Sequence, residues 1–168
     1  MSHPISRLSI RNPWHLLATG FGSGLSPIIP GTMGTLAAVP FYLLLAHLPI
    51  WLYSLLVLFA CFIGVKICQL TATDMKVHDH GSIVWDEFVG FWITMFIVPF
   101  LQLPVWDWRW LVSGFVLFRF FDMVKPWPIG WLDKRIDGGL GIMLDDIVAG
   151  VISAFMLVVI GAWAGWLN

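Results

Sequence analysis

The sequence predicts an all-α protein, a compact helical membrane bundle with short first helices and a full-length transmembrane helix at its C-terminal end. Of the 168 residues, 59% are hydrophobic and only 11% are charged, whereas soluble domains carry about 25% charged residues. The mean hydropathy is +0.87. The apolar residues fall into runs separated by segments rich in glycine, proline and charge, a pattern typical of helices joined by loops. A chain of this length forms a single domain.

The first 34 residues are expected to form an N-terminal segment that ends in a loop. Residues 12–19 favour a short amphipathic helix, whereas residues 20–34 hold five glycines and two prolines, which disfavour a regular helix. Backbone N–H groups and hydroxyls in this loop could bind an anion; the candidate residues are Ser26, Gly31, Thr32 and Gly34. The alternative is a turn that only lets neighbouring helices approach one another, and the spacing does not decide between the two.

Residues 35–146 are expected to form the helical core. The apolar runs 35–46 and 50–65 are separated by a break at Pro49, which predicts a helical hairpin. The second helix of the hairpin is expected to continue in amphipathic form as far as Thr73.

Two further apolar runs, 88–103 and 110–121, complete the core. Pro99 is expected to kink the first of them and Pro104 to end it. The C-terminal segment 147–168 contains the only run as long as the roughly 20 residues that a spanning helix needs. The four shorter runs are expected to span as well, although a partly submerged bundle would give the same pattern.

The lysine and arginine residues predict the orientation of the chain. With five spans, one side of the membrane receives the N-terminus and the segments 66–86 and 119–146. Of the nine Lys and Arg residues, only Arg109 falls on the other side. Cytoplasmic loops are enriched in positive charge, so the N-terminus is expected in the cytoplasm and the C-terminus outside. The same assignment places every chemically rich segment at the cytoplasmic surface, which predicts one site there.

Five carboxylates are the candidate metal ligands. They form two adjacent pairs at the predicted starts of two helices, with a fifth between them: Asp86, Glu87, Asp122, Asp145 and Asp146. One acid is enough to cap a helix, whereas adjacent pairs at one surface repel unless a cation neutralises them, and carboxylate oxygens suit Mg²⁺. Gly90 and Gly150 lie about one turn beyond the pairs and would let the two helices pack closely.

A metal held by carboxylates most often works with phosphate, which needs cationic partners. Lys125 is the candidate point charge. Arg119 lies three residues before Asp122 on the same helix face, although its side chain could equally reach the membrane interface. His78 and His80 flank Asp79. Either imidazole could act as a general acid or base, or be an ordinary polar loop residue.

Four segments, taken in order, resemble the phosphatidylglycerophosphatase A family. They are Gly-Leu-Ser-Pro with Pro-Gly-Thr-Met-Gly at 24–34, the stretch 78–90, Phe-Asp with Lys-Pro-Trp-Pro at 121–128, and the stretch 139–150. The resemblance implies a Mg²⁺-dependent phosphatase that converts phosphatidylglycerophosphate to phosphatidylglycerol. It implies a multi-pass protein of the bacterial cytoplasmic (inner) membrane, whose partners are its lipid substrate and membrane lipids. Neither nucleic acid nor an obligate protein partner is expected.

On this resemblance each candidate residue receives a role. The five carboxylates bind Mg²⁺, with Asp86 also a candidate catalytic group. His78 or Asp79 activates water or protonates the leaving oxygen. Phosphate is held by the remaining candidates, which are Ser26, Gly31, Thr32, Gly34, His80, Arg119 and Lys125. A carboxylate nucleophile that forms an acyl phosphate stays open as an alternative to direct attack by water.

Three other classes of function remain as alternatives. Broken helices with glycine-rich loops and intramembrane acids also mark ion transporters and channels, but here the acids lie at one face rather than at the membrane midplane. A phosphotransferase would give the phosphate to an alcohol instead of water. A purely structural membrane subunit would leave the clustered acids without an explanation.

Overall fold

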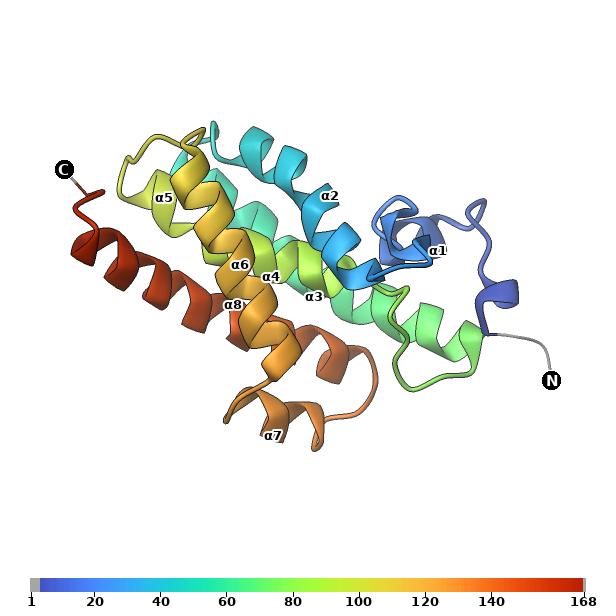
Figure 1. Ribbon diagram of the computed structural model, residues 1–168. Helices are drawn as coiled ribbons and strands as arrows, with labels where there is room; N and C mark the ends of the chain where they lie inside the picture. The colour runs from blue at the N-terminus through green and yellow to red at the C-terminus, as the bar shows by residue number, and fades with distance from the viewer. Residues whose placement is uncertain (1–3, 168) are drawn as a thin grey trace.

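Helices make up most of the described chain, residues 4–167 (Figure 1). This computed structural model contains no β-strand over that range, so the predicted all-α class is confirmed. The elements in chain order are η1 (Pro4–Arg7), α1 (Pro13–Ala18), η2 (Ser23–Leu25), α2 (Pro30–Leu45), α3 (Ile50–Met75), α4 (Trp85–Met95), α5 (Ile97–Phe100), α6 (Trp108–Val124), α7 (Ile129–Asp133) and α8 (Gly138–Trp163).

The short helix α4 is the centre of the bundle, in contact with α2, α3, α6 and α8. The indole N–H of Trp85 donates to the carbonyl of Ala60 on α3 at 3.2 Å, and that of Trp92 donates to the carbonyl of Ala38 on α2 at 3.1 Å. These bonds satisfy both buried indoles and fix the rotation of α4. They therefore also fix the direction in which the acidic pair of its first turn points.

α4 and α8 cross in close contact at two glycines, as the sequence predicts. A Cβ atom at Gly150 would lie 2.5 Å from the carbonyl oxygen of Gly90 and 3.2 Å from Cβ of Ile93. The hydroxyl of Thr94 donates to the carbonyl of Gly90 at 3.0 Å. Because neither glycine carries a side chain, the two backbones touch, which brings together the acids one turn away on each helix.

Two helices are long and apolar enough to cross a membrane, α3 and α8, with 26 residues each. The expectation that only the final run reaches spanning length is therefore wrong, because α3 continues without a break through its polar half. Only 28% of the most apolar window of α3 is buried inside the protein. A core helix of a soluble protein would be mostly buried, so this helix presents its apolar side chains to the surroundings.

Three helix boundaries differ from the prediction. α2 begins at Pro30 inside the expected loop, because proline suits the first position of a helix. α6 continues to Val124, and α8 begins at Gly138, nine residues early. The glycines of α8 form a helix because its first turn packs on α3, where the Gly139 N–H donates to the side-chain oxygen of Gln69 at 2.7 Å. This packing outweighs the poor helix propensity of glycine.

The expected kink of the third apolar run lies at Phe96, where α4 passes into α5. Pro99 has no N–H to donate to the carbonyl of Met95 and its ring crowds that carbonyl, so the kink appears one turn before the proline.

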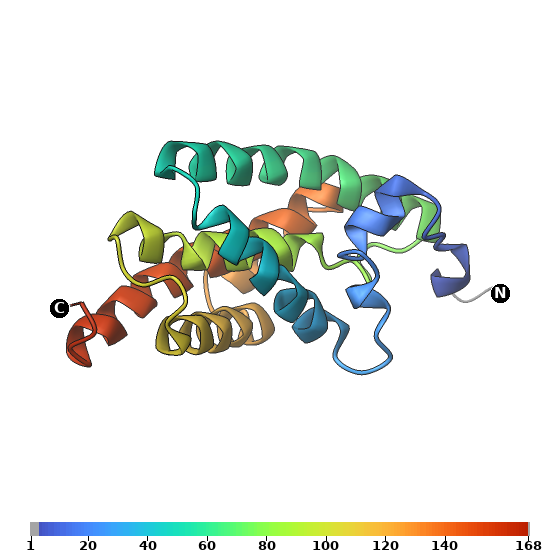
Figure 2. The same ribbon diagram turned by 90° about the horizontal axis from the view of Figure 1, so that it is seen from above.

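The polar segments gather at one end of the bundle. α1 and the loop after α3 lie at the end near the N-terminus, while the α2–α3 turn, α5 and the C-terminus lie at the opposite end (Figures 1 and 2). α3 therefore runs toward the polar end and α8 runs away from it. The two helices thus run in opposite directions between the two ends of the bundle.

Candidate active site

The acidic pairs of α4 and α8 each lie about one turn from the glycine crossing. Asp86 and Glu87 occupy the first turn of α4, as predicted. Asp145 and Asp146 are buried about two turns inside α8 and not at its start, because that helix begins at Gly138. The idea that this second pair caps a helix is therefore wrong, so its burial has another cause.

Arg119 links the acid of α4 to the end of α6. Its guanidinium donates to Glu87 at 3.2 Å and also to Asp122, three residues further along α6. The side chains of all three residues are nearly buried, so each charge depends on its partners. The predicted alternative for Arg119, an extended side chain at the membrane interface, does not occur.

The glycines at the start of α2 make room for this ion pair. A Cβ atom at Gly31 would overlap the Glu87 carboxylate and lie 3.0 Å from the Arg119 guanidinium, and one at Gly34 would lie 2.9 Å from Glu87 Oε2. At these two positions the glycines allow neighbouring groups to approach closely, and anion binding by the segment stays a prediction. Thr32 lies half-buried in the same turn, and the Ser26 hydroxyl donates to the carbonyl of Ile28 at 2.9 Å.

Lys125 joins the second acidic pair to the segment after α6. It ends α6 in the left-handed conformation, with φ of 44°. Its ammonium group donates to Asp133 at 2.8 Å and to Asp145 at 2.5 Å. Burial lowers the pKa of Lys125, but the two hydrogen bonds outweigh it and the net pKa is raised. The lysine therefore stays charged and balances part of the acidic cluster.

Four buried carboxylate oxygens in the described chain have no hydrogen-bond partner. They belong to all four acids of the two pairs: Oδ1 of Asp86, Oε2 of Glu87, Oδ1 of Asp145 and Oδ2 of Asp146. A buried charged oxygen without a partner is costly, and hard oxygen donors of this kind suit Mg²⁺. The donor set therefore fits a divalent cation in its chemistry. Among residues 4–167, however, no three His, Cys, Asp or Glu side chains lie in an arrangement that would hold a metal.

Burial and like charges raise the pKa of Asp86 and Glu87, which lie in the first turn of α4 and precede the apolar run 88–103. Burial is the largest cause for both residues. It raises the pKa of Glu87 to about 8 against the opposing effect of Arg119, and it raises the pKa of Asp86 well above its usual range. The charges of Glu87, Asp79 and Asp145 add to the shift at Asp86. These acids thus lie close enough to repel one another, which a bound cation would relieve.

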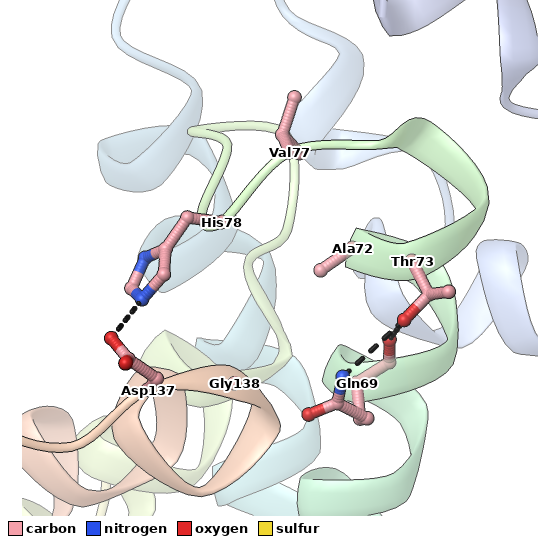
Figure 3. Close-up of a pocket in the computed structure, with 7 residues that line it drawn as sticks. All are labelled: Gln69, Ala72, Thr73, Val77, His78, Asp137 and Gly138. Atoms are coloured by element: carbon pink, nitrogen blue, oxygen red, sulfur yellow. Dashed lines mark hydrogen bonds and ion pairs between the residues drawn. The ribbon is translucent and has the colours of Figure 1, made fainter.

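The histidines lie beside the cluster rather than in it. His78 Nε2 bonds to Asp137 at 2.7 Å (Figure 3). The pair lies on the rim of a hollow of about 420 Å³, together with side chains of Gln69 and Thr73. Nδ1 of His80 accepts a hydrogen bond from its own loop, the N–H of Ser82, at 3.1 Å. Both His78 and Asp79 are exposed.

Comparison with known proteins assigns the family. A sequence profile described as phosphatidylglycerophosphatase A matches residues 16–161. The chain belongs to the phosphatidylglycerophosphatase A family. It is 63% identical to the phosphatidylglycerophosphatase A of Escherichia coli (strain K12) over 93% of this chain and 88% of that one. It is 42% identical to the protein of that name from Haemophilus influenzae over 96% of this chain and 97% of that one.

A third relative carries a different substrate in its name. This protein of Bacteroides thetaiotaomicron, provisionally named a phosphatidylinositol-3-phosphatase, is 37% identical over 88% of this chain and 92% of its own length. No solved structure matches the chain. The three names agree on phosphatase activity and on a phospholipid headgroup. Membership of the phosphatidylglycerophosphatase A family therefore makes this chain a phosphatase.

The structure places most of the predicted site residues at the same end of the bundle. Two sets of ion pairs hold these residues: Arg119 binds Glu87 and Asp122 with the start of α2 against them, and Lys125 binds Asp145. The sequence analysis did not single out two partners in these ion pairs, Asp133 and Asp137. No local spacing marks them, because Asp137 lies 59 residues from its histidine partner and Asp133 reaches Lys125 only through the fold of α7.

Proposed function

We propose that this phosphatase removes the terminal phosphate of phosphatidylglycerophosphate, with Mg²⁺, at the cytoplasmic face of a bacterial membrane. The carrying observation is the set of four buried, unpartnered carboxylate oxygens beside Arg119 and Lys125, at the polar end of an apolar bundle. The substrate follows the names of the two most similar relatives described above, which cover nearly the whole chain.

The acids of α4 and α8 would hold the metal, with Asp122 close by. A bound Mg²⁺ would neutralise these charges, polarise the phosphoryl group and favour hydroxide over water. The ion pair with Arg119 fixes the Glu87 carboxylate against α6 and the start of α2, and Lys125 fixes the Asp145 carboxylate.

The chain's own cations and hydrogen-bonding groups would position the phosphate. Arg119 is a rigid, always charged donor held between two helices, so it can stabilise negative charge that develops on the phosphoryl oxygens. His78 Nε2 bonds to Asp137, and within residues 4–167 no hydrogen bond to its Nδ1 is present. His78 or Asp79 would then take a proton from the attacking water or give one to the leaving oxygen.

The surface of the bundle supports a membrane location with several passes. Large apolar side chains are exposed along α2, α3, α6 and α8, including Phe62, Phe120 and Phe155. Lysine and arginine residues concentrate at the end that holds the acids, and this bias supports a site that faces the cytoplasm. A lipid headgroup could reach the acids there while its tails stay in the bilayer.

The test is phosphate release from phosphatidylglycerophosphate by the purified protein in detergent, with Mg²⁺ and with EDTA. We expect release that EDTA stops and added Mg²⁺ restores. Release that EDTA does not affect would contradict the metal. No release from folded protein would contradict the substrate, and parallel assays would then distinguish hydrolysis of phosphatidylinositol 3-phosphate, phosphate transfer to an added alcohol, and ion flux in liposomes.

A further inference from the structure

A hollow of about 260 Å³ lies between α2 and α6 and is lined only by apolar side chains. Leu36 and Val39 form one wall, and Leu111, Val112 and Phe115 form the other. Leu36 and Val112 are 54% and 52% exposed, so the hollow opens on the outer surface of the bundle.

The side chains of α6 that line this hollow lie on the same helix face as Arg119. Leu111, Phe115 and Arg119 are spaced four residues apart, so they lie on one stripe of the helix surface. The ring of Phe115 also packs edge-on against Phe91 of α4, with centroids 6.4 Å apart, and Phe91 lies four residues after Glu87. The residues beside the hollow and the Arg119–Glu87 ion pair therefore occupy the same faces of α6 and α4.

The α2 side of the hollow also lies on a helix face that reaches Arg119. Gly31, Thr35 and Val39 are again four residues apart on one stripe, with the Thr35 hydroxyl donating to the carbonyl of Gly31. Gly31 adjoins the Arg119 guanidinium. The two helices run antiparallel, so both stripes descend from the ion pair into the hollow. The eight residues from Gly31 to Val39 span about 12 Å along the helix.

Two further apolar hollows lack such a path. One of them lies between α3, α4 and α8. Between this hollow and the acids the three helices pack tightly, since a Cβ atom at Gly64 would lie under 3 Å from the side chains of Met143 and Trp85. The other is lined by Trp85 and Trp92, which lie on the opposite face of α4 from Glu87.

We propose that one acyl chain of the phospholipid substrate lies in the α2–α6 hollow while its phosphorylated headgroup meets Arg119. This inference rests on the proposed function, because it assigns a place to the tail of the lipid whose phosphate is removed. The apolar walls suit a hydrocarbon chain, and the charged end of the same stripes suits the phosphate with its metal. The hollow therefore selects substrates that carry long chains.

The test compares Val112→Trp, which fills the hollow, with Val116→Trp as its matched control. Val116 is on the same helix, is 57% exposed and does not line the hollow. kcat/KM is measured in one detergent for a dioleoyl and a dihexanoyl substrate. We expect Val112→Trp to lower kcat/KM about tenfold or more for the dioleoyl lipid and less than twofold for the dihexanoyl lipid, with Val116→Trp changing neither. Equal losses on both lipids, or none on either, would overturn the proposal.

A second pair of variants covers the case in which Val112→Trp does not fold. Leu36→Trp fills the hollow from α2, and Leu44→Trp, at an exposed position outside the hollow, is its control. The same chain-length selectivity is expected from Leu36→Trp alone.

Photo-crosslinking separates this proposal from the proposed function because it needs no turnover. Phosphatidylglycerol with a diazirine in one acyl chain should label peptides of α2 and α6 in the wild type, and lose that label in Val112→Trp but not in Val116→Trp. This pattern from a protein that hydrolyses neither substrate would retain the hollow and reject the substrate assignment. Labelling that Val112→Trp leaves unchanged would reject the hollow.

Discussion

At the scale of single residues, the acids of α4 and α8 are buried with too few positively charged partners to balance them. Arg119 and Lys125 supply two positive charges for Glu87, Asp122, Asp133 and Asp145, while Asp86 and Asp146 have no cation bonded to them among the described residues. Since uncompensated burial of charge destabilises a protein by several kcal/mol, these positions cost stability in the absence of a ligand. That cost is expected where a residue serves binding rather than folding.

The first prediction uses this conflict between stability and function at Asp146. Asp146→Asn keeps the shape of the side chain but removes its charge. We expect kcat/KM to fall about 100-fold or more, since even changes around a metal ligand cost 10- to 100-fold. We expect the thermal midpoint of the metal-free protein to stay equal or rise, because repulsion from Asp86 and Asp145 is relieved.

Asp107→Asn is the control for this prediction. Asp107 caps α6 at the far end of the bundle and pairs with Arg109, so its change should leave activity within about twofold, as expected away from the site. Near-normal activity of Asp146→Asn would show that Asp146 is not a ligand. A lower thermal midpoint together with lower activity would show a structural role.

The second prediction concerns the pairing of Lys125 with Asp145. Lys125→Met leaves the buried Asp145 without its cation, and because the lysine is partly exposed we expect a loss of about 1–3 kcal/mol in unfolding free energy. Adding Asp145→Asn should recover much of the loss, so a double-mutant cycle by chemical unfolding in detergent should give a coupling of about 1 kcal/mol or more. Lys134→Met, at an exposed position, should change stability by less than about 0.5 kcal/mol. Additive effects of the two changes would contradict a stabilising pair.

At the scale of helices, close packing between glycines decides where the acids lie. The sequence carried enough information to predict the pairing of α4 with α8, because Gly90 and Gly150 stand about one turn beyond two acidic pairs. The start of α8 could not be predicted, because three glycines in four residues are typical of a loop. They form a helix here because they pack against α3. Helix interiors were predictable from hydrophobicity, whereas these ends depend on contacts distant in sequence.

The third prediction tests that crossing. Gly150→Ala places a methyl group against the backbone of Gly90, so α4 and α8 must separate. We expect a loss of about 1–3 kcal/mol in stability from overpacking, and a fall in kcat of about tenfold or more because the acidic pairs move apart. Gly81→Ala is the control, since its Cβ would meet nothing closer than 3.5 Å and the residue does not need positive φ. Unchanged activity in Gly150→Ala would show that the spacing of the helices does not set the site.

At the scale of the whole molecule, the candidate site was predicted because charge is rare in this chain. The chain has few charged residues, and most of those that are not needed for topology lie at one end of the bundle. The charge bias of the loops had already predicted that these residues share one side of the membrane. The pairings themselves could not be predicted. His78 meets Asp137 only because the loop after α3 and the start of α8 lie side by side, and no periodicity in the sequence encodes that contact.

The last prediction concerns how the bundle lies in the membrane. α3 runs toward the polar end and α8 runs away from it, so the C-terminus and the basic segment around Lys134 should face opposite sides. Alkaline phosphatase fused after the full chain should be active in a bacterial host, because that reporter folds only outside the cytoplasm. In a variant with both native cysteines replaced, Lys134→Cys should react with a membrane-impermeant maleimide only after the cells are opened. An inactive C-terminal reporter with Lys134→Cys still protected would mean that α8 turns back instead of crossing. Labelling of Lys134→Cys in intact cells would mean that the site faces outward, where the proposed access from the cytoplasm would not exist.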